Sequence, residues 1–154
     1  MVCNILYFPM VIYTPSTSSL LRQSHQHKRT GALIVTTPHT LALQDAARGI
    51  RMFETVGVPI TGLVQNMSLF KCPHCGGATH VFGDDTADAD EATGGVRHLC
   101  KTHGIDILAD IPLHPRIGGD GQSGRPTVVA EPGSERAELF MGLAKDVAAR
   151  IGLS

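Results

Sequence analysis

The sequence predicts an α/β fold in which a partial parallel sheet is flanked by helices. From Gly31 onward, short apolar runs rich in β-branched residues alternate with longer segments whose apolar residues recur at helical spacing. Strands that alternate with helices in this way form parallel sheets with right-handed crossovers. A length of 154 residues suits one domain with its own core, and the sequence contains no repeat.

The first predicted strand is Ala32–Thr36, which is apolar on both faces, as strands of a covered parallel sheet are. A helix follows, with Thr40 as its predicted N-cap. Gly57 and Pro59 end this helix, because glycine favours the left-handed cap and proline cannot continue the turn. The apolar positions repeat with a period near 3.6 residues and are Leu43, Ala47, Ile50 and Phe53.

The same alternation continues to the carboxyl end of the chain. The further predicted elements are a strand Ile60–Gln65, a short strand Thr79–Phe82, a helix Val96–His103 closed by Gly104, and a strand Ile105–Ile111. Ser134 is the predicted cap of a last helix, which carries Phe140, Leu143, Val147 and Ile151 on one face. Residues 87–92 are acidic and flanked by glycine, which predicts a loop.

Composition excludes several functional classes. The net charge is −1, with neither a basic excess nor a charge run, which argues against binding to nucleic acid. No run approaches the roughly 18 apolar residues of a membrane span. Four cysteines are too few for a secreted disulfide framework. A reducing compartment is therefore expected, with Cys100 as a small core residue.

Residues 1–30 differ from the remainder and are predicted to be a separate tail before a domain over residues 31–154. The segment starts apolar, continues rich in Ser and Thr, and contains no Asp or Glu. Scarce acids together with Ser and Arg resemble an organelle transit peptide. A poorly ordered tail is the alternative interpretation.

Lys71–Gly77 contains the one Cys-x-x-Cys pair of the chain, Cys72 and Cys75. Two thiolates at this spacing reach one metal centre from a single turn, whereas structural zinc and iron–sulfur clusters take four ligands. One chain therefore supplies half a site. A second copy could supply the rest, or His80 and another histidine could complete a zinc site. The pair could also be a redox dithiol, but such pairs need a helix N-terminus beneath the first cysteine, and Gly76-Gly77 disfavours one.

Polar residues also follow the predicted strands, at the sheet edge where α/β proteins bind ligands. Asn66 directly follows an apolar strand. Its amide offers a donor and an acceptor, so it can read a purine edge. It can equally close a turn by bonding to its own backbone.

Several segments, in order, resemble the C-terminal half of the Mrp-type P-loop ATPases, which are iron–sulfur cluster scaffolds and carriers. They are Gly31–Pro38, Leu43–Phe53, Gln65–Ser68, Cys72–Cys75, Thr79–Gly83, Ile111–Leu113 and Gly124–Pro126. The resemblance is closest to the mitochondrial branch that serves respiratory complex I. It implies that Cys72 and Cys75, with the same pair from a second subunit, share a [4Fe–4S] cluster across a homodimer. It further implies that Asn66 contacts a nucleotide base and that Pro112 borders it.

The chain departs from this family in one respect. No Walker A loop precedes Gly31, and residues 1–30 contain no glycine. That loop holds the phosphates and the Mg²⁺. We therefore expect no ATP hydrolysis by this polypeptide, and ATP/Mg as a cofactor is in doubt although the family uses it. The predicted function is a cluster scaffold or carrier for apo iron–sulfur proteins, complex I subunits among them, in the mitochondrial matrix or alternatively the cytoplasm.

Overall fold

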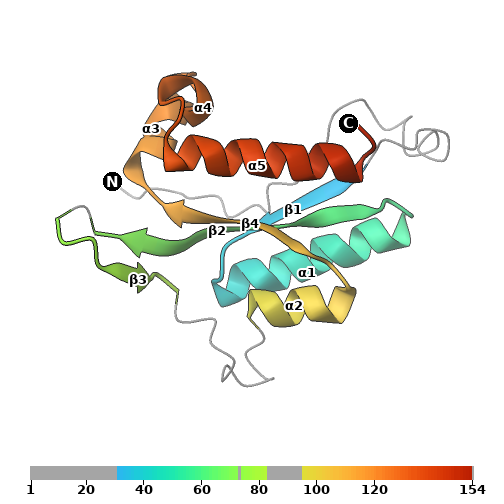
Figure 1. The fold of residues 1–154 in the computed structure, drawn as a ribbon. Coiled ribbons are helices and arrows are strands. Elements are labelled where there is room, and N and C mark those ends of the chain that lie inside the picture. The colour runs from blue at the N-terminus through green and yellow to red at the C-terminus, as the bar shows by residue number, and fades with distance from the viewer. Residues whose placement is uncertain (1–30, 73, 83–94, 154) are drawn as a thin grey trace.

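The computed structural model describes residues 31–72, 74–82 and 95–153. The predicted loop at residues 87–92 and the tail over residues 1–30 lie outside this part. The described elements, in chain order, are β1 (Ala32–Thr36), α1 (Thr40–Thr55), β2 (Ile60–Lys71), β3 (Ala78–His80), α2 (Val96–His103), β4 (Ile107–Leu113), α3 (Pro115–Gln122), α4 (Thr127–Ala130) and α5 (Glu135–Arg150) (Figure 1).

β2 is the central strand of the sheet. It pairs in parallel with β1 on one side and with β4 on the other, and its far end pairs antiparallel with β3. The helices α1 and α2 cover one face of the sheet and α5 lies over the opposite face (Figure 1). This arrangement confirms the predicted α/β fold with a partial parallel sheet and flanking helices.

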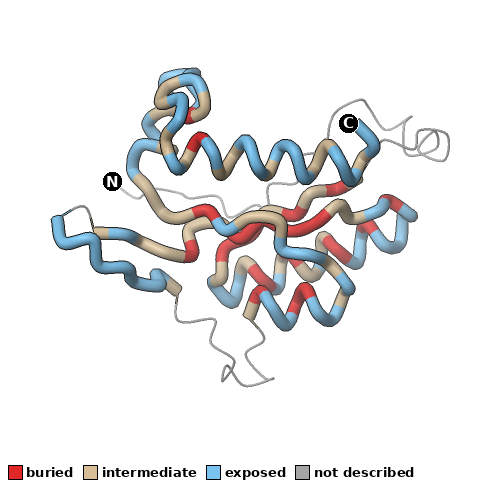
Figure 2. Tube along the Cα trace, in the orientation of Figure 1, coloured by how far each residue is buried: buried red, intermediate tan, exposed pale blue. Residues whose placement is uncertain are grey.

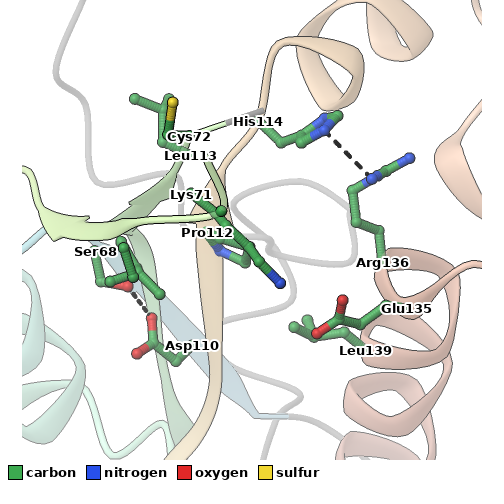
Figure 3. Close-up of a pocket in the computed structure, with 13 residues that line it drawn as sticks. Ser68, Lys71, Cys72, Asp110, Pro112, Leu113, His114, Glu135, Arg136 and Leu139 are labelled. Carbon is green, nitrogen blue, oxygen red and sulfur yellow. Dashed lines mark hydrogen bonds between the residues drawn. The ribbon is translucent and has the colours of Figure 1, made fainter. Parts of the chain in front are cut away.

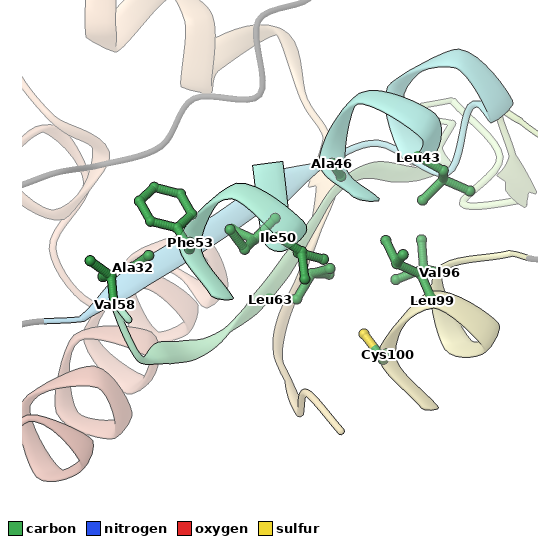
Figure 4. Close-up of a cluster of buried hydrophobic side chains, with 11 residues drawn as sticks. Ala32, Leu43, Ala46, Ile50, Phe53, Val58, Leu63, Val96, Leu99 and Cys100 are labelled. Carbon is green, nitrogen blue, oxygen red and sulfur yellow. The ribbon is translucent and has the colours of Figure 1, made fainter. Parts of the chain in front are cut away.

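The hydrophobic core lies between the sheet and the helices α1 and α2 (Figures 2 and 4). Alternate residues of β1 point into it, because side chains alternate across a strand. The predicted stripe on α1 is confirmed except that Ala46 is fully buried whereas Ala47 is half-buried. Cys100 is buried in this core, as predicted. The core side chains are Ala32, Ile34, Leu43, Ala46, Ile50, Phe53, Val58, Leu63, Val96, Leu99 and Cys100.

Element ends differ from the predictions in physically understandable ways. α1 is capped by His39 rather than Thr40, since the His39 Nδ1 accepts from the Leu41 N–H at 3.2 Å. The Ser134 cap of α5 is confirmed, with its hydroxyl accepting from the Ala137 N–H at 3.2 Å. β4 begins and ends two residues later than the predicted strand Ile105–Ile111.

β2 continues to Lys71, well past the predicted end at Gln65. A bulge makes this extension possible: Met67 has a left-handed φ of 58°, and the pairing of β2 with β4 shifts between Asn66 and Phe70. Beyond the bulge, β2 forms a hairpin with β3. The extended β2 therefore carries the Cys-x-x-Cys turn beyond the main sheet (Figure 1).

The face under α5 is less densely covered. Within α5 only Ala137 is buried. Arg150 fastens the end of the helix to the sheet through an ion pair with Asp106 at 2.9 Å and a hydrogen bond to the Thr61 carbonyl at 3.2 Å. In the described part of the chain, no helix is long and apolar enough to cross a membrane.

Candidate metal centre and adjoining cleft

The two cysteines lie at the tip of the β2–β3 hairpin. Two backbone hydrogen bonds close the turn, from the Cys72 N–H to the Gly77 carbonyl at 2.8 Å and from the Gly76 N–H to the Cys72 carbonyl at 2.9 Å. Gly76 has a φ of 71°, a conformation that glycine adopts without a Cβ clash. Cys72 is half-buried and Cys75 is exposed. The turn thus presents both thiols at the surface within one short loop.

The turn also favours ionisation of Cys72. The backbone N–H of Cys75 contributes most to lowering the pKa of the Cys72 thiol below its ordinary value, followed by the N–H of His74 and the Cys75 thiol. Hydrogen bonds donated to a thiolate stabilise the charged form. Because the thiolate is the form that binds soft metals, the turn prepares Cys72 as a ligand.

Among the described residues, the turn contributes two metal ligands, Cys72 and Cys75. Within the described residues, no group of three or more His, Cys, Asp and Glu side chains is placed to hold a metal ion. The zinc site that His80 would complete therefore does not form in this part of the chain. The helix that a redox dithiol needs beneath Cys72 is also missing from the turn, which joins two strands.

A cleft of about 690 Å³ adjoins the hairpin, and Cys72 forms part of its wall (Figure 3). Pro112, which was predicted to border a nucleotide base, lines the cleft, whereas Asn66, the predicted base contact, is not among the described residues of its wall. Asn66 is half-buried in β2 and pairs with Ile111, the residue before Pro112. The lining residues are Ser68, Leu69, Lys71, Cys72, Gly76, Ala78, Asp110, Pro112, Leu113, His114, Glu135, Arg136 and Leu139.

A network of charged and polar side chains borders the cleft on the side opposite the hairpin. Glu131 accepts hydrogen bonds from both Arg116 and Arg136. Nη1 of Arg136 lies 3.3 Å from Nε2 of His114. The other ring nitrogen of His114, Nδ1, caps α3 by accepting from the Arg116 N–H at 3.2 Å. These contacts hold the starts of α3 and α5 beside the end of β4.

This side of the cleft was not predicted from the sequence. The helices α3 and α4 were not predicted, because the α3 sequence PRIGGDGQ is rich in glycine and lacks an apolar stripe. Across the sheet, the Ser68 hydroxyl donates to the Asp110 carboxylate. The one available sign of this pair was the position of both residues near the ends of predicted strands.

Solved structures define the class of the fold. The cell-division ATPase MinD of Pyrococcus furiosus superposes with a TM-score of 0.53 at 22% identity, over 76% of this chain and 41% of that one. A nucleotide-binding protein of Archaeoglobus fulgidus, solved in complex with ADP, gives a TM-score of 0.52 at 30% identity over 73% of this chain and 42% of that one. The fold is that of the MinD-like P-loop ATPases.

The family follows from the sequence. A family profile described as "ParA: NUBPL iron-transfer P-loop NTPase" matches residues 10–148, and the chain belongs to this family. The mouse iron-sulfur cluster transfer protein NUBPL is 44% identical over 79% of this chain and 35% of its own length. An Arabidopsis thaliana iron-sulfur protein required for NADH dehydrogenase, mitochondrial, is 41% identical over 80% and 37%. An iron-sulfur cluster carrier protein of Haemophilus influenzae is 41% identical over 89% and 35%.

These matches confirm the resemblance to iron–sulfur carriers of the P-loop class. The chain spans about a third of the length of these relatives. The profile match begins at residue 10, within the segment 1–30 that was predicted to be a separate tail.

Proposed function

We propose that this chain is an iron–sulfur cluster carrier in which Cys72 and Cys75 bind the cluster. The observation that carries the proposal is the hairpin turn, which places two thiols at the surface and lowers the pKa of one of them. Membership of an iron-transfer family supports the same function. A thiol pair at the surface is suited to a cargo that must arrive and leave, whereas a structural metal is normally enclosed by four ligands.

We propose a [4Fe–4S] cluster as the cargo, shared between two copies of the chain. Each copy supplies two thiolates from the described residues, and such a cluster takes four. A homodimer that brings two hairpin tips together completes the set without any further ligand type. Release then requires that thiols of an acceptor protein replace those of the carrier one at a time, and the exposed Cys75 is the more accessible of the two.

We also propose that the chain retains part of a nucleotide site. Asn66 and Pro112 lie on neighbouring strands near the carboxyl ends of the parallel sheet, where such folds place ligands. The archaeal neighbour with a related fold was solved with ADP. Because residues 1–154 contain no Walker A motif, the contacts with ATP that we propose for these residues are those to the base.

The proposed acceptors are apo iron–sulfur proteins, with respiratory complex I subunits as the first candidates. The plant relative bears the name of a protein required for NADH dehydrogenase in mitochondria, and this supports a mitochondrial matrix location. A cytoplasmic location is the alternative, which the bacterial carrier proteins among the relatives support.

Anaerobic reconstitution tests the carrier function. We expect about two irons per chain, with matching acid-labile sulfide, in a dimer. Cys72→Ala and Cys75→Ala should each abolish the visible absorbance of the cluster. Cys100→Ala is the matched control, because Cys100 is buried in the core far along the chain from the hairpin. Purification with zinc and no iron would favour a zinc module, and a protein that takes up neither metal would favour a dithiol.

A further inference from the structure

We propose that the cleft beside Cys72 is the docking site for the protein that receives the cluster. The occupant we infer is an extended segment of the acceptor that carries an acidic residue next to one of its cluster-binding cysteines. This inference rests on the proposed carrier function and adds to it the place and the chemistry of recognition.

The position of the cleft is the first argument. One wall is the hairpin with Lys71 and Cys72, and the opposite wall is the start of α5 with Arg136 and Leu139 (Figure 3). Because Cys72 belongs to the wall, a segment lying in the cleft is held next to a cluster ligand. Exchange of ligands between carrier and acceptor requires this proximity, since the incoming thiol must reach the same metal centre.

The lining of the cleft suits a peptide. Its larger apolar residues come from the three elements β2, β4 and α5 and are half-buried, so each leaves part of its surface available to a partner: Leu69, Pro112, Leu113 and Leu139. The volume of about 690 Å³ exceeds the space of one side chain. Contact with these apolar surfaces would supply affinity that does not depend on the cysteines.

The charges of the cleft favour an acid on the hairpin side. Arg136 is paired with Glu131, and the Asp110 carboxylate accepts from Ser68. Lys71 is exposed, directly precedes Cys72 and makes no ion pair with the described residues. Its side chain points from the hairpin across the cleft (Figure 3). The opposite wall carries the acidic residue Glu135. An acidic residue of the acceptor would therefore be attracted to Lys71 on the hairpin side and repelled by the opposite wall.

The experiment uses cluster-loaded carrier and a fluorescently labelled apo ferredoxin with a Cys-x-x-Cys-x-x-Cys loop, made with either Asp or Lys beside its first cysteine. We measure the rate of cluster transfer and the binding anisotropy at low ionic strength. The Asp form should bind more tightly by about fivefold, and Lys71→Glu should reverse this preference. Leu139→Glu should weaken binding of both forms by about tenfold, because it places a charge in the apolar wall.

Matched controls lie on the same helix. Met141→Glu introduces the same charge at an exposed position outside the cleft wall, and Lys145→Glu makes the same charge reversal as Lys71→Glu. Neither should change binding or transfer. Lys71→Glu and Leu139→Glu must still load as much iron as the unmodified chain, and circular dichroism checks their folding.

The docking site would be overturned if all four variants bound each ferredoxin form as tightly as the unmodified chain does. Loss of iron from Lys71→Glu would also overturn it, since Lys71 would then stabilise the cluster rather than an acceptor. Failure of the carrier function has a different signature, because the unmodified chain itself would take up no iron. In that case the binding anisotropy of the labelled ferredoxin is measured with carrier that holds no cluster. The docking site still predicts weaker binding by Leu139→Glu than by Met141→Glu.

Discussion

Replacing Gly76 with alanine tests whether the hairpin turn itself prepares Cys72 as a ligand. Gly76 has a φ of 71°, and a Cβ built there would meet no other atom within 4 Å. The cost of Gly76→Ala is therefore conformational and not steric. A left-handed conformation costs an L-residue about 1 kcal/mol relative to glycine. The turn can avoid this cost only by leaving the conformation that directs its amides at Cys72.

We expect Gly76→Ala to raise the pKa of Cys72 toward its ordinary value, because the N–H groups of Cys75 and His74 would no longer converge on the thiolate. The assay is the pH dependence of alkylation at Cys72, followed by mass spectrometry. The midpoint should move to higher pH, so that at a fixed pH near neutrality alkylation and iron uptake both become slower.

Gly57→Ala is the matched control for this experiment. Gly57 has a φ of 70°, also with no atom within 4 Å of a built Cβ, but it lies at the end of α1 rather than in the hairpin. It should cost the same stability, about 1 kcal/mol, and leave the alkylation of Cys72 unchanged. An unchanged alkylation midpoint in Gly76→Ala would refute the claim that the turn amides set this pKa.

Three further predictions concern stability and nucleotide binding. Ile50→Ala should lower the free energy of unfolding by about 2–5 kcal/mol, since Ile50 is fully buried, whereas Met52→Ala on the exposed side of α1 should change it by less than about 0.5 kcal/mol; chemical denaturation compares the two. Ser134→Ala should cost about 1 kcal/mol by removing the cap of α5, measurable as a lower Tm, and an unchanged Tm would contradict the role of the cap. Titration of this polypeptide with Mg-ATP should show affinity no tighter than micromolar, because charge-assisted contacts to phosphate supply most of the binding energy and the sequence has no Walker A loop; submicromolar binding would show that other residues replace it.

The sequence predicted the elements whose burial leaves a periodic pattern. The helices α1 and α2 and the strand β1 each bury a regular set of apolar residues and were predicted close to their actual bounds. The bounds of α5 were also predicted closely, but its predicted apolar face is only half-buried. The extension of β2 was missed because Asn66, Met67 and Ser68 interrupt the apolar run, and the bulge that accommodates them depends on pairing with another strand.

The residues of the candidate site were likewise predicted only in part. Cys72 and Cys75 were found from sequence because their spacing alone carries the chemistry of a thiolate pair. Arg136 and Leu139 were not, because nothing in the sequence of a surface helix says which distant hairpin it faces. Their place in the cleft depends on how α5 packs across β4, and that packing is a property of the whole fold.

The bulge at Met67 sets how far the hairpin reaches along the end of β4. Between Asn66 and Phe70 the strand β2 takes four residue steps while β4 takes two, from Ile111 to Leu113, so two residues of β2 have no counterpart in β4. A chain lacking both would keep the two cysteines, their spacing and the whole core under α1. The register of Cys72 against β4 would nevertheless move by two residues, about 6.6 Å along the strand. The place of the thiol pair along the cleft thus depends on a residue count within β2, which comparison of motifs alone would overlook.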